Sequence, residues 1–341
     1  MKDYTLEQLS LLLKSKGDDS LLLREKANSL TEKIYGKNVY LRGIIEFSNL
    51  CKKDCLYCGI RKSNSKIPRY TIEKERIKEL IKKSYEDGFR TIVLQSGEVD
   101  IYDRDLTEII EYTKKNFDMA ITLSVGERRR ERYYEWKRAG ADRFLLRIET
   151  TNRELFKKLH PDDDFDVRLE ALLTLKELGY ETGTGVMIGL PGQTHDDLAK
   201  DILFFKIYDF DMLGVGPFIP HHQTPLKDQK PPDFELVLNF IALLRLVTIN
   251  TNIPATTSMA TLDKEGREKA LNSGANVIMP NYTPQEYREK YQLYDNKICL
   301  KEDEKSTLMI TEETVKRAGK ILVKERGDRR EKLITDIPVD L

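Results

Sequence analysis

Three cysteines within eight residues form the densest group of metal-ligand candidates in the sequence. Cys51, Cys55 and Cys58 have the spacing C-x3-C-x2-C, whereas the fourth cysteine, Cys299, stands far away along the chain. Three thiolates can hold three irons of a 4Fe–4S cluster, which leaves the fourth iron open to an external ligand. A zinc site normally takes four ligands, and the nearest histidine is His160. A zinc knuckle lacking one ligand is the alternative, and a cluster with one open iron is the interpretation we favour.

Two further groups combine small or charged residues with apolar runs. Ser96, Gly97 and Glu98 follow one run, where glycine permits close approach of a ligand and a carboxylate can receive an ammonium group. Arg147 and Glu149 are two positions apart in another run, so a strand would send both to the same face. The alternatives are an ordinary strand-to-helix turn for the first group and a structural ion pair for the second.

A glycine-rich stretch over 183–194 contains Met187 and Gly189. Glycine at this density suits a backbone that approaches a nucleoside. The stretch lacks G-x-G-x-x-G spacing at a strand–helix turn, so it does not predict a dinucleotide phosphate loop. Arg168, at the start of a predicted helix, could pair with a ligand carboxylate because a guanidinium matches carboxylate geometry. Taken alone, Arg168 would be an ordinary surface residue.

Short β-rich runs alternate with charged amphipathic segments from residue 38 onward, which predicts a parallel sheet covered by helices. The predicted strands cover 39–47, 91–95, 119–125, 143–148, 182–188, 212–215, 253–257 and 277–279. The predicted helices between them cover 72–87, 104–115, 131–139, 153–159, 167–178, 194–208, 234–246 and 264–272. We therefore predict a complete (β/α)8 TIM-type barrel, in which the active site lies at the carboxyl ends of the strands. An open doubly wound sheet is the alternative.

Three regions are expected along the chain: an N-terminal helical cap over 1–37, the barrel over 38–294 and a C-terminal extension over 295–341. Leucines at helical spacing indicate the cap. Glycines at positions 88, 140, 179 and 274 are expected to end helices in a left-handed conformation. In the extension we predict a last helix over 311–324 and a charged, mobile tail from 328.

Composition excludes several classes of protein. Lys+Arg and Asp+Glu are both 57 in 341 residues, which argues against a dedicated nucleic-acid or anionic-membrane surface. No apolar run approaches the ~20 residues that span a bilayer, and no signal peptide is visible. Clustered cysteines argue for a metal site rather than a disulfide framework. We expect a cytoplasmic protein without nucleic-acid or membrane partners.

The cysteine spacing, the aromatic Tyr57 before the third cysteine and the elements that follow resemble the radical S-adenosylmethionine (SAM) superfamily. The resemblance implies an enzyme with one 4Fe–4S cluster, held by Cys51, Cys55 and Cys58, that reductively cleaves SAM to methionine and a 5′-deoxyadenosyl radical. It assigns SAM binding to Tyr57, Ser96, Gly97, Glu98, Glu149, Arg168, Met187 and Gly189. In these assignments Glu98 receives the amino group, Glu149 the ribose hydroxyls and Arg168 the methionine carboxylate.

Further segments resemble the HydE family, radical SAM maturases of FeFe-hydrogenase, with methylornithine synthase and biotin synthase as related families. These segments are 44–49, 91–98, 179–183, 214–221, 253–257 and 274–281. The resemblance implies a role in assembly of the H-cluster di-iron subsite, together with partner maturation proteins. The implied substrate is small and polar, a cysteine-bound iron carbonyl cyanide unit, whose sulfur the adenosyl radical would attack.

By the same resemblance a set of polar and apolar side chains surrounds the substrate inside the barrel. The set is Arg147, Thr122, Ser124, Thr256, Thr257, Met279, Tyr291 and Tyr294. Each has another interpretation, because threonine is common in strands for its β propensity, methionine is common in cores and the tyrosines could pack a lid.

Cys299 lacks the later cysteine partners that a second cluster would need, since Thr307 and Ile310 stand near the expected positions. We therefore expect a single cluster and a buried, apolar role for Cys299. Adjacent His221 and His222 are expected to point apart rather than to bind a metal. The competing functions are an amino-acid mutase resembling methylornithine synthase, a HydE-like paralogue with another small substrate, and a cluster carrier. Ser96–Glu98, Glu149 and Arg168 favour an enzyme, because a carrier needs no SAM site.

Overall fold

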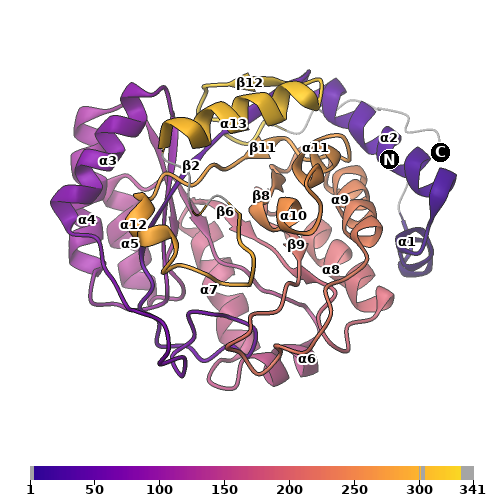
Figure 1. Cartoon of the computed structure of the whole chain (residues 1–341), viewed down its shortest axis with the longest axis horizontal. Coiled ribbons are helices and arrows are strands. Elements are labelled where there is room, and N and C mark those ends of the chain that lie inside the picture. Colours follow the sequence, from indigo (N-terminus) through magenta and orange to yellow (C-terminus); the bar gives the residue numbers. More distant parts are fainter. Residues whose placement is uncertain (1–3, 299, 301–303, 332–341) are drawn as a thin grey trace.

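The computed structural model describes residues 4–298, 300 and 304–331. Two helices open the chain, α1 (Leu6–Leu13) and α2 (Gly17–Tyr35). Thr5 begins α1 with a capping box, in which its side chain accepts the Gln8 N–H and Gln8 reaches back to the Thr5 N–H. The two helices pack against α8 (His195–Tyr208) and α9 (Phe234–Thr248), as Figure 1 shows, so the predicted N-terminal helical segment is present.

A six-stranded parallel sheet forms the centre of the molecule, in the order β2-β3-β4-β5-β6-β8. Its strands are β2 (Gly43–Ser48), β3 (Thr91–Ser96), β4 (Ala120–Ser124), β5 (Arg143–Leu145), β6 (Glu181–Thr184) and β8 (Met212–Leu213). Runs such as Ile92-Val93-Leu94 are buried on both faces, as expected for parallel strands covered by helices.

A second parallel sheet has the order β10-β11-β1-β12. Its strands are β10 (Pro254–Ala255), β11 (Val277–Ile278), β1 (Asn38–Leu41) and β12 (Ile321–Val323), and a short parallel pair joins β7 (Met187–Ile188) to β9 (Gly216–Pro217). Single parallel bridges, Ile44 with Asn281 and Met212 with Asn252, connect the two larger sheets at both edges. The fold is therefore an α/β arrangement of parallel sheets, and the ladders do not run continuously around a complete barrel.

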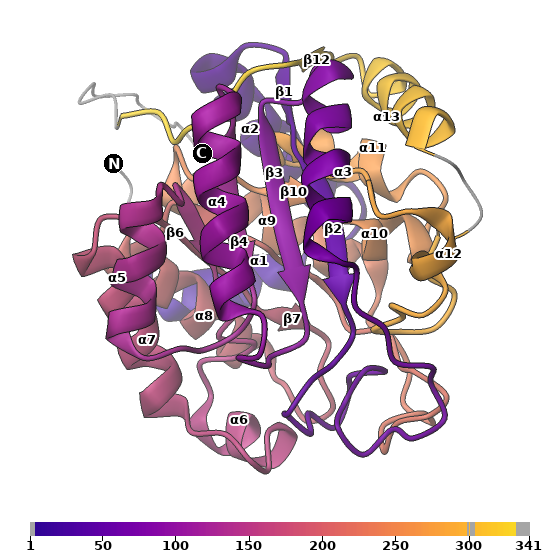
Figure 2. The ribbon, with the colours of Figure 1, turned by 90° about the vertical axis from the view of Figure 1, so that its left-hand side faces the viewer.

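Helices follow the strands and cover the outside of the sheets. They are α3 (Lys74–Glu86), α4 (Asp103–Asn116), α5 (Arg130–Ala139), α6 (Arg153–Leu159), α7 (Phe165–Glu177), α10 (Thr257–Leu262), α11 (Gly266–Leu271), α12 (Gln285–Arg288) and α13 (Glu304–Arg317), besides α8 and α9. Figure 2 shows α3, α4 and α5 in front of the central strands, with the β2 and β3 arrows pointing towards the end where α6 lies. Among the described residues, none of the helices has the length and apolar character needed to cross a bilayer.

Several predicted boundaries are wrong in informative ways. The strand expected over 39–47 is interrupted at Arg42, whose guanidinium turns inward to the Met212 sulfur and the Gly327 carbonyl. The helix expected over 311–324 ends earlier, because Gly319 adopts φ 72° and the next residues join the sheet as β12. The glycines expected to end helices do adopt positive φ, for example Gly140 with φ 111°.

The first residues of the expected mobile tail are packed rather than free. Arg329 pairs with Asp209 and Asp211, and Asp328 pairs with the buried Arg143. These contacts lie around the amino ends of the central strands, so residues 326–330 cover the side of the sheet opposite to the strand carboxyl ends. The tail beyond residue 331 lies outside the described residues.

Asp201 on α8 gives the fold a pH-dependent element. Its side chain is fully buried and accepts the Thr151 N–H and hydroxyl, and its second oxygen has no hydrogen-bond partner among the described residues. Burial raises the pKa of Asp201 to about 7, and the nearby Asp197 adds to the shift. Between about pH 4 and pH 7 the Asp201 carboxyl is protonated in the native protein and ionised in the unfolded chain. The stability that Asp201 contributes is therefore fully present below about pH 4 and is lost as the pH rises through 7.

We expect Asp201→Asn to remove most of this pH dependence, because the amide still accepts from Thr151 and does not ionise. The free energy of unfolding of the native sequence should fall, relative to that of the variant, by up to a few kcal/mol between pH 4.5 and pH 8, since one pKa unit is worth about 1.4 kcal/mol. Urea unfolding at both pH values measures this, with Asp118→Asn at an exposed position as control. If the native protein and Asp201→Asn differ in free energy of unfolding by the same amount at pH 4.5 and at pH 8, the raised pKa assigned to Asp201 is wrong.

Candidate active site

A cavity of about 380 Å³ opens at the carboxyl ends of the central strands. Every residue that the sequence analysis assigned to the cluster, to SAM or to the substrate lines it, except Gly189. Gly189 has φ 84°, and a Cβ there would lie 2.4 Å from the Pro232 side chain. Glycine at this position thus serves packing against Pro232, and the structure places it away from the cavity.

The cysteine loop follows β2 and brings its three thiols to the mouth of the cavity. Cys51, Cys55 and Cys58 are half-buried free thiols. Burial, with a smaller effect of Cys51, raises the pKa of Cys58 to about 12 in the absence of a metal. The Glu98 N–H donates to the Cys51 sulfur at 3.4 Å. Three converging thiols are the donor set that an iron–sulfur cluster requires.

Close packing of the loop after β3 against the cysteine loop depends on Gly97. A Cβ at this position would lie 2.2 Å from the Leu50 carbonyl oxygen and 2.8 Å from Cys51 Cβ. Arg69 holds the cysteine loop from the other side, because its guanidinium donates to the carbonyls of Asn49, Ile60, Arg61 and Asn64. The loop is therefore fixed by backbone contacts on both sides.

Charged groups cluster beside the cysteine loop. Lys53 Nζ lies 2.8 Å from Asp163, 3.5 Å from Glu98 and 3.7 Å from Glu127. Arg168 donates to Glu127 and Asp163 and, at 2.8 Å, to the Arg147 carbonyl. Three cations, namely Lys53, Arg168 and the more exposed Lys52 at 4.0 Å from Glu98, thus face three carboxylates. Glu98 is the carboxylate of this balanced network that lines the cavity beside the cysteine loop, where it can pair with an incoming ammonium group.

These contacts change the expectation for Arg168. Burial alone would lower the pKa of Arg168, but Glu127 and Asp163 raise it above its ordinary value. The guanidinium is already held by two carboxylates. Arg168 therefore lines the cavity as part of an ion-pair network rather than as an unpaired carboxylate clamp.

Arg147 and Glu149 face the cavity from the segment after β5. Arg147 Nη2 lies 3.0 Å from Glu149 Oε2, yet these atoms and Arg147 Nε make no hydrogen bond among the described residues. Glu149 adopts φ 64°, a conformation rare for a residue other than glycine and frequent at functional sites. Since β5 ends at Leu145, this strained turn rather than strand alternation brings both side chains to one side. Arg147 and Glu149 are therefore ion-paired with each other, and the buried Arg147 Nε is the atom that a ligand would complete.

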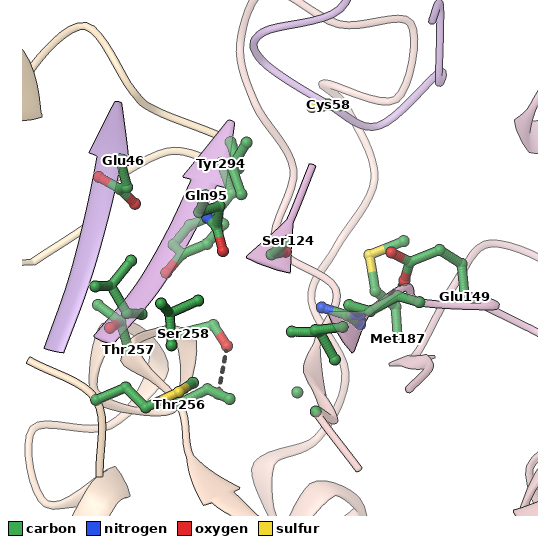
Figure 3. Close-up of a pocket in the computed structure, with 18 of the residues that line it drawn as sticks. Glu46, Cys58, Gln95, Ser124, Glu149, Met187, Thr256, Thr257, Ser258 and Tyr294 are labelled. Atoms are coloured by element: carbon green, nitrogen blue, oxygen red, sulfur yellow. Dashed lines mark hydrogen bonds and ion pairs between the residues drawn. The ribbon is translucent and has the colours of Figure 1, made fainter. Parts of the chain in front are cut away.

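Figure 3 shows Glu46, Gln95 and Tyr294 across the cavity from Glu149 and Met187. The remaining predicted substrate residues also line it: Thr122, Ser124, Thr256, Thr257, Met279 and Tyr291. The buried Thr122 hydroxyl has no hydrogen-bond partner among the described residues.

Thr256 and Thr257 are not strand residues as expected, because Thr256 caps α10 and Thr257 is its first residue. The Thr256 hydroxyl lies 2.9 Å from the Ser258 hydroxyl, and Thr257 accepts from Arg267. Both side chains therefore reach the cavity from a helix start.

The two adjacent histidines do not point apart, so that expectation is wrong. Their rings stack with centroids 4.6 Å apart, and His222 Nδ1 lies 2.6 Å from Asp295 Oδ1. The Gln223 N–H donates to His221 Nδ1, so a neutral His221 carries its proton on Nε2 and offers no lone pair there to a metal. Although His221, His222 and Asp295 lie close enough to surround an ion, these hydrogen bonds favour the interpretation as loop polarity. Cys299 lies outside the described residues.

Comparisons with known proteins agree with this geometry. Residues 45–205 match the Radical SAM superfamily. The chain is 48% identical over 331 residues to the [FeFe] hydrogenase maturase subunit HydE of Thermotoga maritima, covering 96% of this chain and 95% of that protein. The chain belongs to the radical SAM superfamily. A 3-methylornithine synthase of Methanosarcina acetivorans is a more distant radical SAM relative, 30% identical over 276 residues, or 80% of this chain and 78% of the synthase.

Solved structures show the same radical SAM fold. Methylornithine synthase (PylB) superposes with a TM-score of 0.81 at 25% identity, covering 94% of each chain. The maturase HydG from Carboxydothermus hydrogenoformans superposes with a TM-score of 0.78 at 22% identity, covering 94% of this chain and 76% of that one. The α/β architecture with a parallel sheet is thus shared with both.

A radical SAM enzyme uses a 4Fe–4S cluster and SAM, and the residues present fit both groups. Cys51, Cys55 and Cys58 would hold the cluster, and the ion-paired Arg147 and Glu149, which both line the cavity, would offer polar contacts to SAM. When bound, the cluster supplies the electron that converts SAM to methionine and a 5′-deoxyadenosyl radical. The chain's own part is to hold these groups together in one cavity at the carboxyl ends of the strands.

The sequence analysis missed several residues of the radical SAM cavity, among them Lys53, Gln95 and an ion pair between Glu46 and Lys297. Lys297 Nζ donates to Glu46 Oε1 at 2.6 Å and to the Tyr291 carbonyl at 3.0 Å. Asn281 donates to the other Glu46 oxygen at 2.8 Å. A carboxylate inside the apolar run Ile44-Ile45-Glu46-Phe47 was the signal available, because a buried charge requires a partner.

Proposed function

We propose that this radical SAM enzyme is a HydE-type maturase that acts in assembly of the di-iron subsite of the FeFe-hydrogenase H-cluster. The observation that carries the proposal is 48% identity to a HydE over 96% of the chain. The match covers 331 residues, so it takes in both the cysteine loop and the segments around the far side of the cavity. A small, polar substrate, such as a cysteine-bound iron carbonyl cyanide unit, suits the polar side chains of Thr122, Ser124 and Arg147 that line the cavity.

The residue roles proposed for this reaction follow the geometry. Glu98, beside Lys53 and Glu127, receives the amino group of SAM. Glu149 takes the ribose hydroxyls through its carboxylate, which pairs with Arg147 and lines the cavity, and Arg147 lies between the SAM and substrate positions. Tyr57 and Met187 lie together in an apolar cluster that suits adenine.

The remaining cavity residues are proposed to contact the substrate, and Arg168 is proposed to hold Glu127 and Asp163 in place around SAM. The substrate residues are Thr122, Ser124, Thr256, Thr257, Met279, Tyr291 and Tyr294.

We also propose that the strands form a closed (β/α)8 barrel over 38–294. The bridges Ile44–Asn281 and Met212–Asn252 support this closure, because they join the two sheets at both edges. The chain is proposed to work in the cytoplasm, where a reducing environment keeps the three cysteines available as ligands. Partner maturation proteins would supply its substrate and receive its product.

A mutase activity is the second candidate, favoured by the 0.81 TM-score to methylornithine synthase. The reconstituted enzyme should be reduced anaerobically in the presence of SAM. It should then be incubated separately with a cysteine-bound iron carbonyl cyanide complex and with lysine, which is an isomer of methylornithine. A maturase should consume SAM with the iron complex and form an adenosyl–sulfur bond, detectable by mass spectrometry. Conversion of lysine to its branched isomer, with no reaction of the iron complex, would contradict the maturase proposal.

A further inference from the structure

The segment after α6 lies along the cysteine loop and contacts it on both sides of Cys55. Residues 159–163 are here called the brace. Lys53 Nζ lies 2.8 Å from Asp163, and the Asp54 N–H donates to Asp162 at 3.1 Å. Beyond Cys55, the Leu56 N–H donates to the Leu159 carbonyl at 2.9 Å, and the Tyr57 hydroxyl lies 2.9 Å from His160 Nε2. Figure 2 shows α6 at the same end of the molecule as the loop after β2.

The direction of the bond between Tyr57 and His160 follows from the other ring nitrogen. His160 Nδ1 lies 2.9 Å from the Phe156 carbonyl, which can only accept, so the imidazole proton is on Nδ1. His160 is 1% exposed, and burial lowers its pKa to about 4, so the ring stays neutral at physiological pH. Nε2 therefore has a free lone pair, and the Tyr57 hydroxyl donates to it.

Three rings are thereby locked in one arrangement. The His160 ring stacks on Phe156 with centroids 4.2 Å apart, and the Tyr57 ring meets the His160 ring edge-on at 81°. Phe156 is fully buried and belongs to the main core, so the chain of contacts begins in a rigid part of the fold. The other end of this chain is the Tyr57 ring, which lines the cavity beside Met187.

We propose that His160 is a positioning residue that sets the plane of the Tyr57 ring against the adenosyl group of SAM, while the brace fixes the backbone on both sides of Cys55. The inference rests on the proposed place of Tyr57 in the SAM site, and it does not depend on which substrate the enzyme uses. Without the acceptor on His160, the part-buried Tyr57 hydroxyl would lose this hydrogen bond and the ring would be free to rotate towards another acceptor. SAM would then bind less tightly, although the cysteines would be unchanged.

Two substitutions of His160 test the contacts of its two ring nitrogens one at a time. In His160→Gln the amide reaches the place of Nε2, so it can accept from Tyr57. In His160→Asn the amide reaches the place of Nδ1, so it can donate to Phe156 and cannot reach Tyr57. Tyr57→Phe removes the hydroxyl and leaves His160 intact. The Asn and Gln variants are therefore a matched pair in which each keeps one of the two contacts of His160, and only Gln keeps the contact to Tyr57.

The experiment measures the dissociation constant of S-adenosylhomocysteine, which is not cleaved, by calorimetry on the cluster-loaded protein, together with KM and kcat for SAM cleavage. We expect His160→Asn and Tyr57→Phe each to weaken binding roughly five- to tenfold, the range for losing one buried neutral hydrogen bond. The double variant should bind no more weakly than either single one, and His160→Gln should bind within about twofold of the native sequence. KM for SAM should rise more than kcat falls.

Three results would each overturn the proposal. The first is that His160→Asn binds S-adenosylhomocysteine as tightly as the native protein, and the second is that His160→Asn and His160→Gln weaken this binding equally. The third is that the double variant weakens binding by the product of the two single effects. If His160→Asn does not fold, as judged by its thermal transition, the proposal is tested by Tyr57→Phe alone. Unchanged affinity of Tyr57→Phe for S-adenosylhomocysteine would mean that the hydroxyl does not orient the ring, and would overturn the proposal. Failure of the maturase reaction with intact S-adenosylhomocysteine binding would count against the proposed function and leave this inference standing.

Discussion

Cys55→Ala is expected to abolish both cluster binding and SAM cleavage. Cys51, Cys55 and Cys58 are the three thiols that converge at the cavity, and two thiolates leave two irons of a 4Fe–4S cluster without protein ligands. The native protein should bind about four irons per chain after anaerobic reconstitution. The variant should lose most of this iron, and its production of 5′-deoxyadenosine should fall below detection. Iron analysis, visible absorption and chromatography of the nucleoside products measure the three quantities.

Cys299→Ala provides the matched control, because the same atoms are removed from a cysteine that was not assigned to the cluster. This variant should keep its iron, its absorption and its SAM cleavage. Continued cleavage by Cys55→Ala would rule out the cluster assignment. Loss of iron in Cys299→Ala would instead show that the fourth cysteine binds metal, contrary to the expectation of a single cluster.

The position of the site could be predicted because it depends on topology rather than on detail. In a parallel α/β fold the carboxyl ends of the strands lie at one edge, so residues that follow different strands meet there. This rule correctly placed Ser96, Glu98, Glu149 and Met187 around the cavity with the cysteines. It needed neither exact strand bounds nor side-chain contacts, which explains why it held although several strands are shorter than expected.

The partners of the charged residues could not be predicted in the same way. Arg168 was expected to be available for a carboxylate of SAM, but Glu127, 41 positions earlier in the chain, already holds it. A sequence shows that an arginine is present and does not show which carboxylates the fold brings to it. Glu149 illustrates a second limit, since its positive φ has no signal in a non-glycine sequence. The neighbouring backbone contacts, Glu149 N–H to Gly185 and Met187 N–H to Glu149, impose it.

Long-range contacts also explain the errors in the secondary structure. Arg42 stands in an apolar run that predicts one continuous strand, yet its bonds to Met212 and Gly327 divide the run into β1 and β2. The segment after Gly319 becomes β12 because residue 38 of β1 lies beside Ile321. Local pattern predicts which segments favour extended structure, whereas the pairing partner decides where each strand begins and ends.

Lys297→Met is expected to lower the free energy of unfolding by about 3–5 kcal/mol, the usual cost of leaving one member of a buried ion pair alone. Lys297 and Glu46 side chains are 7% and 6% exposed, and their closest atoms are 2.6 Å apart. Among the described residues, the Glu46 carboxylate keeps only the Asn281 amide when the ammonium group is lost, and the Tyr291 carbonyl loses the Lys297 donor. Urea unfolding of the apo-protein measures the loss, so iron content does not affect the comparison.

The double variant Glu46→Leu with Lys297→Met tests whether the cost arises from an unpaired charge rather than from altered packing. Replacing both members of a buried pair by apolar groups of similar size is often neutral, so the double variant should regain most of the stability lost in Lys297→Met. The cavity of the double variant lacks the polar side chains of Glu46 and Lys297. Turnover of the substrate should therefore fall, whereas SAM cleavage should persist because neither residue is assigned to the SAM site. A double variant as unstable as the single one would mean that Glu46 and Lys297 stabilise the fold through packing, independently of each other. A cost below about 1 kcal/mol for Lys297→Met would show that solvent reaches the pair and screens it, as at an exposed ion pair.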